Sequence, residues 1–307
     1  MAELNPGARR FVESVLAAPH VWEIPIADAR RFMEEETLEV WGEPDAVADV
    51  ADRDLGGIRA RVYRPDADGA LPVVVYFHGG GWVVGSIESH DPLCRALAVG
   101  APSVVVSVDY RLAPEHPFPA AVGDAWAATQ WVAEHAAELG ADPERLVVAG
   151  DSAGGNLAAV VALRARDAGL RLALQVLIYP VTDADLDSSG YARLGEGLNL
   201  TRAKMEWYWR RYLDGADGVH PDASPLRAAE LAGVAPALVQ TAEYDPLGDE
   251  GADYAHRLRE AGVPVTLTQY DGQVHGFIRL RSYCGEQADE AIAEIASAIQ
   301  AARPASR

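Results

Sequence analysis

The chain has 307 residues, and its 26 Lys and Arg residues against 46 Asp and Glu residues give a formal net charge of −20 at pH 7. A charge of this sign argues against nucleic acid or an anionic membrane as a partner. Hydrophobic residues make up 49% of the chain, and no uncharged run reaches the ~18 apolar residues that a membrane span requires, so we expect a globular protein with a large core and no membrane span.

The cysteines and the N-terminal residues bear on location and cofactors. The first residues contain no apolar stretch typical of a secretory signal, which favours a cytoplasmic protein. Cys94 and Cys284 have no metal-ligand spacing, and buried thiols are their ordinary role. No cluster of His, Cys and Asp has such spacing either, so we expect neither a metal nor a cofactor. The oligomeric state stays open, a homodimer included.

Residues 1–50 predict helices that stand apart from the rest of the chain. The apolar residues that recur there near helical spacing are Ala29, Phe32, Met33, Val40 and Trp41. The acidic residues expected on the solvent side of these helices are Glu34, Glu35, Glu36 and Glu39. Next along the chain, residues 58–65 alternate between apolar and polar, which predicts an antiparallel strand at the leading edge of a sheet.

From about residue 73 onward, apolar runs alternate with helical patterns. This rhythm predicts an α/β fold, a mostly parallel central sheet with helices on both faces. The expected strands are 73–77, 103–110, 146–150, 172–179, 237–244 and 265–270. The expected helices are 121–139, 156–169, 201–213 and 250–262.

The segment HGGGW (78–82) follows the first of these strands. Successive glycines are costly in conformational entropy, so a folded protein keeps them where backbone amides must approach something closely. Taken alone, the cluster would indicate a flexible turn. A loop of this type supplies oxyanion-hole donors in lipases and esterases, and the amides of Gly79 and Gly80 are the candidates.

The segment GDSAGG (150–155) lies between a predicted strand and a predicted helix. The G-x-S-x-G turn is so sharp that a Cβ two residues either side of the serine would crowd the strand and the helix, and Gly150 and Gly154 fill these positions. Ser152 is therefore the candidate nucleophile. The amide of Ala153 opens the helix and is the third candidate donor to an oxyanion.

A serine nucleophile on this fold requires an acid and then a histidine further along the chain. Only His220, His256 and His275 follow Ser152. His220 lies in a polar stretch and His256 in a helical pattern. His275 follows the predicted strand 265–270 through a predicted turn at 271–273, where a catalytic base is expected.

Three aspartates compete for the role of the acid. Asp245 follows the apolar run 237–244 and precedes Pro246, so it is favoured, although it could also cap a helix. Asp183 follows the run 172–180 and is the competitor. Asp249 is expected to support the site or the surface.

Residues 186–223 fall outside the alternation of strands and helices. Their central helix, 201–213, places Met205, Tyr208, Trp209 and Tyr212 on adjoining faces. The residues considered for lining a substrate pocket are Trp82, Trp207 and Trp209. Ordinary helix packing is an equally good interpretation of Trp207 and Trp209.

These motifs resemble those of the hormone-sensitive-lipase-like bacterial carboxylesterases. The resemblance covers nearly the whole chain, and its segments are HGGGW (78–82), DYRLAPEHPFPAA (109–121), GDSAGG (150–155), YPVTD (179–183), EYDPLGDEG (243–251) and HGF (275–277). It implies an α/β-hydrolase fold with Ser152, Asp245 and His275 as the catalytic triad. It also implies an oxyanion hole formed by the amides of Gly79, Gly80 and Ala153.

By the same resemblance, residues 1–50 and 186–223 form a helical cap over a core made of 51–185 and 224–307. We therefore expect an enzyme that hydrolyses a small-molecule ester with a short to medium acyl chain through an acyl-enzyme. An amidase, a lactonase or an acyltransferase would use the same machinery. The plant gibberellin receptors resemble the family as non-catalytic binding proteins without the histidine, so His275 favours an enzyme.

Overall fold

The apolar runs of the sequence form one central sheet in the computed structural model, which describes residues 2–303. The eight strands are β1 (Asp49–Asp54), β2 (Arg59–Arg64), β3 (Leu71–Phe77), β4 (Val104–Val108), β5 (Ala141–Asp151), β6 (Leu174–Ile178), β7 (Ala237–Tyr244) and β8 (Val265–Val274). Their order in the sheet is β1-β2-β4-β3-β5-β6-β7-β8. The strands from β4 to β8 pair in parallel, which confirms the expected mostly parallel sheet.

The leading edge of the sheet differs from the prediction. The segment predicted as the edge strand, β2, pairs antiparallel with β4 on one side and with β1 on the other, so β1 is the edge. The sequence of β1, DVADRD, is polar and its side chains are exposed or half-buried, so it carries no alternating apolar signal. β1 also begins at Asp49, within the segment assigned to the first helices.

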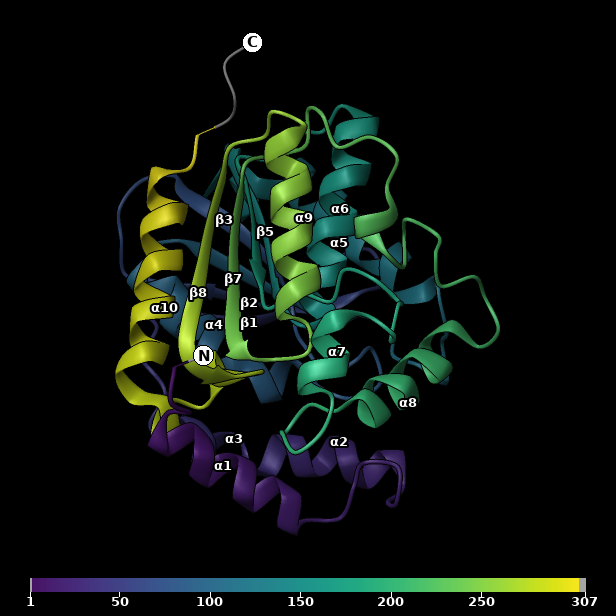
Figure 1. Cartoon of the computed structure of the whole chain (residues 1–307). Coiled ribbons are helices and arrows are strands. Elements are labelled where there is room, and N and C mark those ends of the chain that lie inside the picture. Colours follow the sequence, from purple (N-terminus) through teal and green to yellow (C-terminus); the bar gives the residue numbers. More distant parts are fainter. Residues whose placement is uncertain (1, 304–307) are drawn as a thin grey trace.

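The described residues form ten α-helices around the sheet: α1 (Pro6–Ala17), α2 (Ile26–Glu35), α3 (Thr37–Trp41), α4 (Ile87–Gly100), α5 (Ala120–His135), α6 (Ala153–Ala168), α7 (Ser189–Leu194), α8 (Arg202–Leu213), α9 (Gly248–Glu260) and α10 (Arg281–Ala301). Among the described residues, no helix is long and apolar enough to cross a membrane. In Figure 1, α10 lies on one side of the sheet and α9, α6 and α5 on the other. The helices therefore cover both faces.

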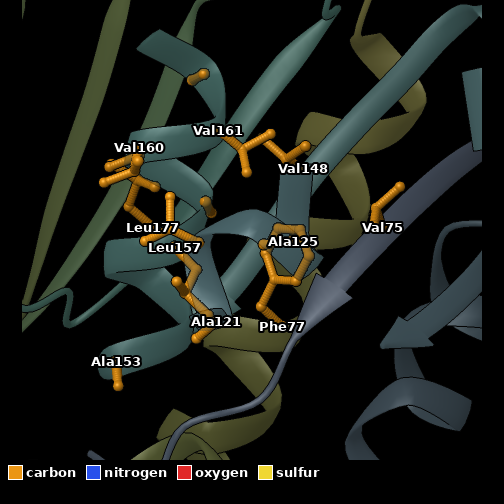
Figure 2. Packing of buried hydrophobic residues seen from close by; sticks show 14 of the residues in the cluster. Val75, Phe77, Ala121, Ala125, Val148, Ala153, Leu157, Val160, Val161 and Leu177 are labelled. Atoms are coloured by element: carbon orange, nitrogen blue, oxygen red, sulfur yellow. The ribbon is translucent and has the colours of Figure 1, made fainter. Parts of the chain in front are cut away.

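The continuous apolar runs divide between these two faces. On β3, Val73, Val75 and Phe77 pack with α5, α6 and α9, whereas Val74 and Tyr76 pack with α4 and α10. Successive side chains of a strand point to opposite faces, so a strand covered on both sides is apolar at most positions. Figure 2 shows part of the first of these layers, where Val161 of α6 lies next to Val148 of β5 and Leu157 of α6 next to Leu177 of β6.

The segments that contain the candidate catalytic residues follow the carboxyl ends of parallel strands. The HGGGW loop follows β3, Ser152 follows β5, Asp245 follows β7 and His275 follows β8. Carboxyl ends of parallel strands meet at one edge of the sheet, which brings these four segments together. The residues predicted as a turn, 271–273, lie within β8, where the pairing with β7 is interrupted after Tyr270 and resumes at Val274.

Candidate active site

The nucleophile candidate sits at a sharp turn between β5 and α6. Ser152 has φ 56° and ψ −119°, a positive φ that is rare for a residue with a side chain. A Cβ at Gly154 or Gly150 would overlap the main-chain oxygen of Phe77 at the end of β3. The two glycines thus let helix, turn and strand approach each other closely, which holds the serine in this strained conformation.

A chain of hydrogen bonds links the serine to a histidine and an aspartate. His275 Nε2 lies 2.9 Å from Ser152 Oγ, and His275 Nδ1 lies 2.7 Å from Asp245 Oδ2. An ionised carboxylate can only accept, so Nδ1 carries the ring proton and Nε2 is free to accept the proton of the hydroxyl. The other oxygen of Asp245 accepts the amide of Leu247 at 2.9 Å, which fixes the carboxylate.

The alternative acids and bases lie elsewhere. Asp183 is buried, but its carboxylate accepts from the Arg227 guanidinium at 2.8 Å rather than from a histidine. Asp249 holds Arg193 of α7 in a bidentate ion pair. His220 and His256 are exposed side chains. Of the competing residues, only Asp245 and His275 are therefore brought to Ser152.

The glycine loop departs from the sequence prediction in one residue. The amide of Gly79 donates to Asp151 Oδ1 at 2.9 Å and faces His90 Nε2 at 3.3 Å, so it is not free to bind an oxyanion. Gly80 and Gly81 line the active-site cavity. The amides of Gly80, Gly81 and Ala153 have no acceptor within residues 2–303. The donor set left open is thus Gly80, Gly81 and Ala153, with Gly81 in the place given to Gly79.

Sequence reasoning missed the buried carboxylate that holds this loop. Asp151 directly precedes the nucleophile, and it accepts from the Tyr76 hydroxyl at 2.7 Å as well as from Gly79. Burial by itself raises the pKa of the Asp151 carboxyl, but the charges of His90 and Arg279 and the Tyr76 hydroxyl together hold that pKa below its usual range. An ionised Asp151 therefore ties the glycine loop to the end of β5. The aspartate inside GDSAGG was the available signal.

His78 and Tyr110 brace the same loop from its other side. Burial lowers the pKa of His78 to about 3, so the imidazole is neutral, and its Nδ1 donates to the main-chain oxygen of Gly79 at 2.8 Å. The Tyr110 hydroxyl donates to the main-chain oxygen of His78 at 2.7 Å. Tyr110 belongs to the DYRLAPEHPFP segment, so that motif acts on the site through the glycine loop.

A cavity of about 250 Å³ opens onto Ser152 and His275. Most of its wall is apolar and comes from two N-terminal helices and from α8, which lies far from them in sequence. The residues are Phe11 and Val15 of α1, Ala29, Phe32 and Met33 of α2, and Met205 and Tyr208 of α8. The polar side chains in the wall include Glu36, Asn199, Lys204 and Arg279. Glu36, expected on the solvent side, faces this cavity. Among the described residues, no group of three or more His, Cys, Asp or Glu could hold a metal.

The three tryptophans considered for the pocket are not among the residues that line the cavity. Trp82 stacks on Tyr212 at 4.0 Å between ring centroids, and Trp209 lies 4.6 Å from Trp82. The Arg211 guanidinium lies over the ring of Trp207 at 3.8 Å. One face of α8, with Met205 and Tyr208, faces the cavity. The adjoining face, with Trp209 and Tyr212, packs against Trp82. The tryptophans thus hold α8 in place.

Comparison with known proteins places the chain among ester hydrolases. The profile of a family described as alpha/beta hydrolase fold matches residues 74–279. The chain is 49% identical over 230 residues to carboxylesterase NlhH of Mycobacterium tuberculosis, a match that covers 73% of this chain and 72% of that protein. It is 42% identical over 314 residues to ethyl acetate hydrolase of Pseudomonas putida, across 97% and 98% of the two chains.

Solved structures of esterases have the same fold. A thermostable esterase from Pseudomonas putida matches with a TM-score of 0.93 and 39% identity over 99% of both chains. An esterase from the archaeon Pyrobaculum calidifontis matches with a TM-score of 0.89 and 43% identity, over 97% of this chain and 98% of that one. The similarity therefore extends through the helices that line the cavity.

Proposed function

This chain belongs to the hormone-sensitive-lipase-like carboxylesterases of the alpha/beta hydrolase family, and we propose that it is a serine esterase for short- to medium-chain carboxylic esters. The observation that carries the proposal is the hydrogen-bonded chain Ser152–His275–Asp245, with distances of 2.9 and 2.7 Å. This arrangement is the one that activates a serine hydroxyl as a nucleophile.

In the acylation step, His275 Nε2 takes the proton of Ser152 as Oγ attacks the ester carbonyl carbon. Asp245 holds the imidazole in the tautomer that can accept this proton, and its charge stabilises the imidazolium that forms. The amides of Gly80, Gly81 and Ala153 donate to the carbonyl oxygen as it becomes an anion. His275 then gives its proton to the leaving alcohol, which leaves an acyl-enzyme on Ser152.

In the deacylation step, water replaces the alcohol. His275 removes a proton from the water as the oxygen attacks the acyl carbon, and the same amides bind the second oxyanion. Collapse of the intermediate returns the proton to Ser152 and releases the carboxylic acid. The protein's own groups supply every proton transfer in this sequence.

The cavity supports small substrates. Its volume of about 250 Å³ lies just below the usual range for ligand pockets, roughly 300–1,000 Å³. Residues of both 1–50 and 186–223 line it, which supports the assignment of these two segments as a cap that limits chain length.

The test is a series of p-nitrophenyl esters with acyl chains from acetate to palmitate, with matched anilides. We expect the highest kcat/KM for the short and medium esters, with far slower turnover of anilides. An enzyme that prefers the anilides would be an amidase, and one that prefers long chains would be a lipase.

A further inference from the structure

The chain contains a single lysine, Lys204, and this residue lines the active-site cavity. Every other positively charged side chain in the sequence is an arginine or a histidine. Lys204 lies in the first turn of α8, where the helix dipole disfavours a positive charge. Helix stability therefore does not explain a lysine at this position.

The Lys204 ammonium is held beside the loop of the histidine. Lys204 Nζ donates to the main-chain oxygen of Asn199 at 3.3 Å, and Asn199 Nδ2 donates to the main-chain oxygen of His275 at 2.8 Å. Asn199 Oδ1 is buried and has no hydrogen-bond partner among the described residues. The Lys204 side chain is thus tethered at the catalytic end of the cavity, although it lies on a helix far from His275 in sequence.

A second cation lines the same wall. Arg279 follows His275 by one turn, and its guanidinium donates to the main-chain oxygen of Ser89 at 3.1 Å. Within residues 2–303, neither Lys204 nor Arg279 has a carboxylate at ion-pair distance. Both cations therefore retain donors that no protein carboxylate accepts.

Two acidic residues of the described chain line the cavity, Asp151 and Glu36, and Glu36 follows the last residue of α2. Burial raises the pKa of the Glu36 carboxyl, and the charges of Arg279 and Lys204 act in the opposite direction. Burial likewise lowers the pKa of the Lys204 ammonium, which Glu36 opposes. Asp151 is a second carboxylate at this wall, but it already accepts from the Gly79 amide and the Tyr76 hydroxyl and forms no ion pair with Lys204 or Arg279.

We propose that the cavity selects esters that carry a second, ionised carboxylate, which Lys204 and Arg279 bind. The two oxygens of a carboxylate can accept from an ammonium and a guanidinium at once, and such charge-assisted bonds are stronger than neutral ones. The remaining wall is mostly apolar and suits the methylene chain between the two carboxyl groups. The substrate class is thus the half-esters of dicarboxylic acids and the esters of hydroxy acids. This inference rests on the proposed esterase activity at Ser152.

The experiment compares an anionic ester with a neutral ester of similar length. In the first pair, monoethyl adipate and ethyl heptanoate, the anionic ester carries its carboxylate on the acyl chain. In the second pair, the acetate of ω-hydroxyhexanoate and heptyl acetate, the anionic ester carries it on the alcohol. The quantity measured is the ratio of kcat/KM for the anionic ester to that for the neutral one, by titration of released acid. Lys204→Met keeps the length of the side chain and removes its charge.

We expect Lys204→Met to lower this ratio by about 10- to 100-fold in at least one pair, the effect of losing hydrogen bonds to a charged group. Lys204→Arg should keep the ratio within a few-fold, and Glu36→Gln should raise it. Arg210→Met removes an exposed charge on the same helix and should leave the ratio unchanged. Equal ratios for the wild type and Lys204→Met in both pairs would overturn the inference. If the wild type hydrolyses none of the four esters, the proposed function fails instead.

A second measurement needs neither turnover nor a variant. Reductive methylation modifies amines, and Lys204 carries the only side-chain amine of the chain. Adipate should slow methylation of Lys204 in the intact protein, read by peptide mass spectrometry, whereas the uncharged 1-heptanol at the same concentration should not. Equal protection by both compounds, or by neither, contradicts binding of a carboxylate at Lys204.

Discussion

Replacement of Asp245 by asparagine tests the assignment of the acid, because the two oxygens of this carboxylate have different partners. Oδ1 accepts the buried amide of Leu247 at 2.9 Å, and Oδ2 accepts Nδ1–H of His275 at 2.7 Å. An asparagine has one oxygen for these two donors. Leaving the Leu247 amide unsatisfied would cost about 1–3 kcal/mol, so the oxygen should turn to Leu247 and the NH₂ group to His275.

The NH₂ group then faces Nδ1, which can accept it only in the tautomer that carries its proton on Nε2. In this tautomer His275 presents N–H to Ser152 and cannot take the hydroxyl proton. We expect kcat to fall by about ten-thousandfold, as for the same replacement in a serine protease, which corresponds to about 5.5 kcal/mol in the barrier.

Asp183→Asn is the matched control, since Asp183 is also a buried aspartate after a strand. Its partner is Arg227, whose side chain is 43% exposed, so the lost ion pair should cost at most about 1 kcal/mol of stability and little activity. The assay is hydrolysis of p-nitrophenyl butyrate by both variants, with thermal unfolding measured alongside. Our reasoning fails if the two variants lose activity equally, or if Asp183→Asn loses more.

Three further predictions follow from the same geometry. Ser152→Ala should lower kcat by about a millionfold while the unfolding temperature stays near that of the wild type, and near-normal turnover by the purified variant would exclude Ser152 as the nucleophile. Met205→Ala should move the acyl-chain preference towards longer esters, because Met205 lines the cavity, whereas Trp209→Ala should cost about 3–5 kcal/mol of stability and leave the preference of the folded enzyme unchanged. If Trp209→Ala changed the acyl-chain preference and Met205→Ala did not, Trp209 rather than Met205 would line the pocket. Because burial lowers the pKa of His78 from 6.5 to about 3, the unfolded chain binds a proton that the folded chain excludes, so His78 should cost about 1.4 kcal/mol of unfolding free energy per pH unit as the pH falls below 6.5. In urea unfolding, the free energy of unfolding of His78→Gln should fall less steeply with decreasing pH than that of the wild type. Equal pH dependence of the two proteins would contradict a neutral buried His78.

The parts of the fold that the sequence predicted are those with a local physical signal. β3, for example, is covered on both faces, so every position is apolar and the apolar run ends where the strand ends. The polar strand β1 lacks this signal, because its pairing with β2 rather than its own burial makes it a strand. The order Ser152, Asp245, His275 was predictable for a related reason, since a fixed topology orders the strand ends that carry these residues.

The site residues that the sequence analysis assigned wrongly are those whose role depends on where an amide or a side chain points. Gly79 and Gly81 are equivalent in the motif, and they differ because the amide of Gly79 points at Asp151. Likewise, Met205 and Trp209 are one turn apart on α8, yet only the former faces the cavity. The orientation of the main chain determines which glycine amide is free, and the rotation of α8 determines which side chain faces the cavity. Neither can be read from composition or from the spacing of residues.

Lys204 is a different case, because composition alone singles it out as the one lysine of the sequence. A count could have identified the residue, but only the hydrogen bonds that run through Asn199 to the main chain of His275 link it to the active site. The segments of the proposed triad and oxyanion hole lie at the ends of the strands, and in the proposed mechanism they determine which bond is attacked. Glu36, Lys204 and most of the cavity wall lie on helices outside those motifs. The choice of substrate can therefore change through substitutions on α1, α2 and α8 while the chemistry at Ser152 stays the same.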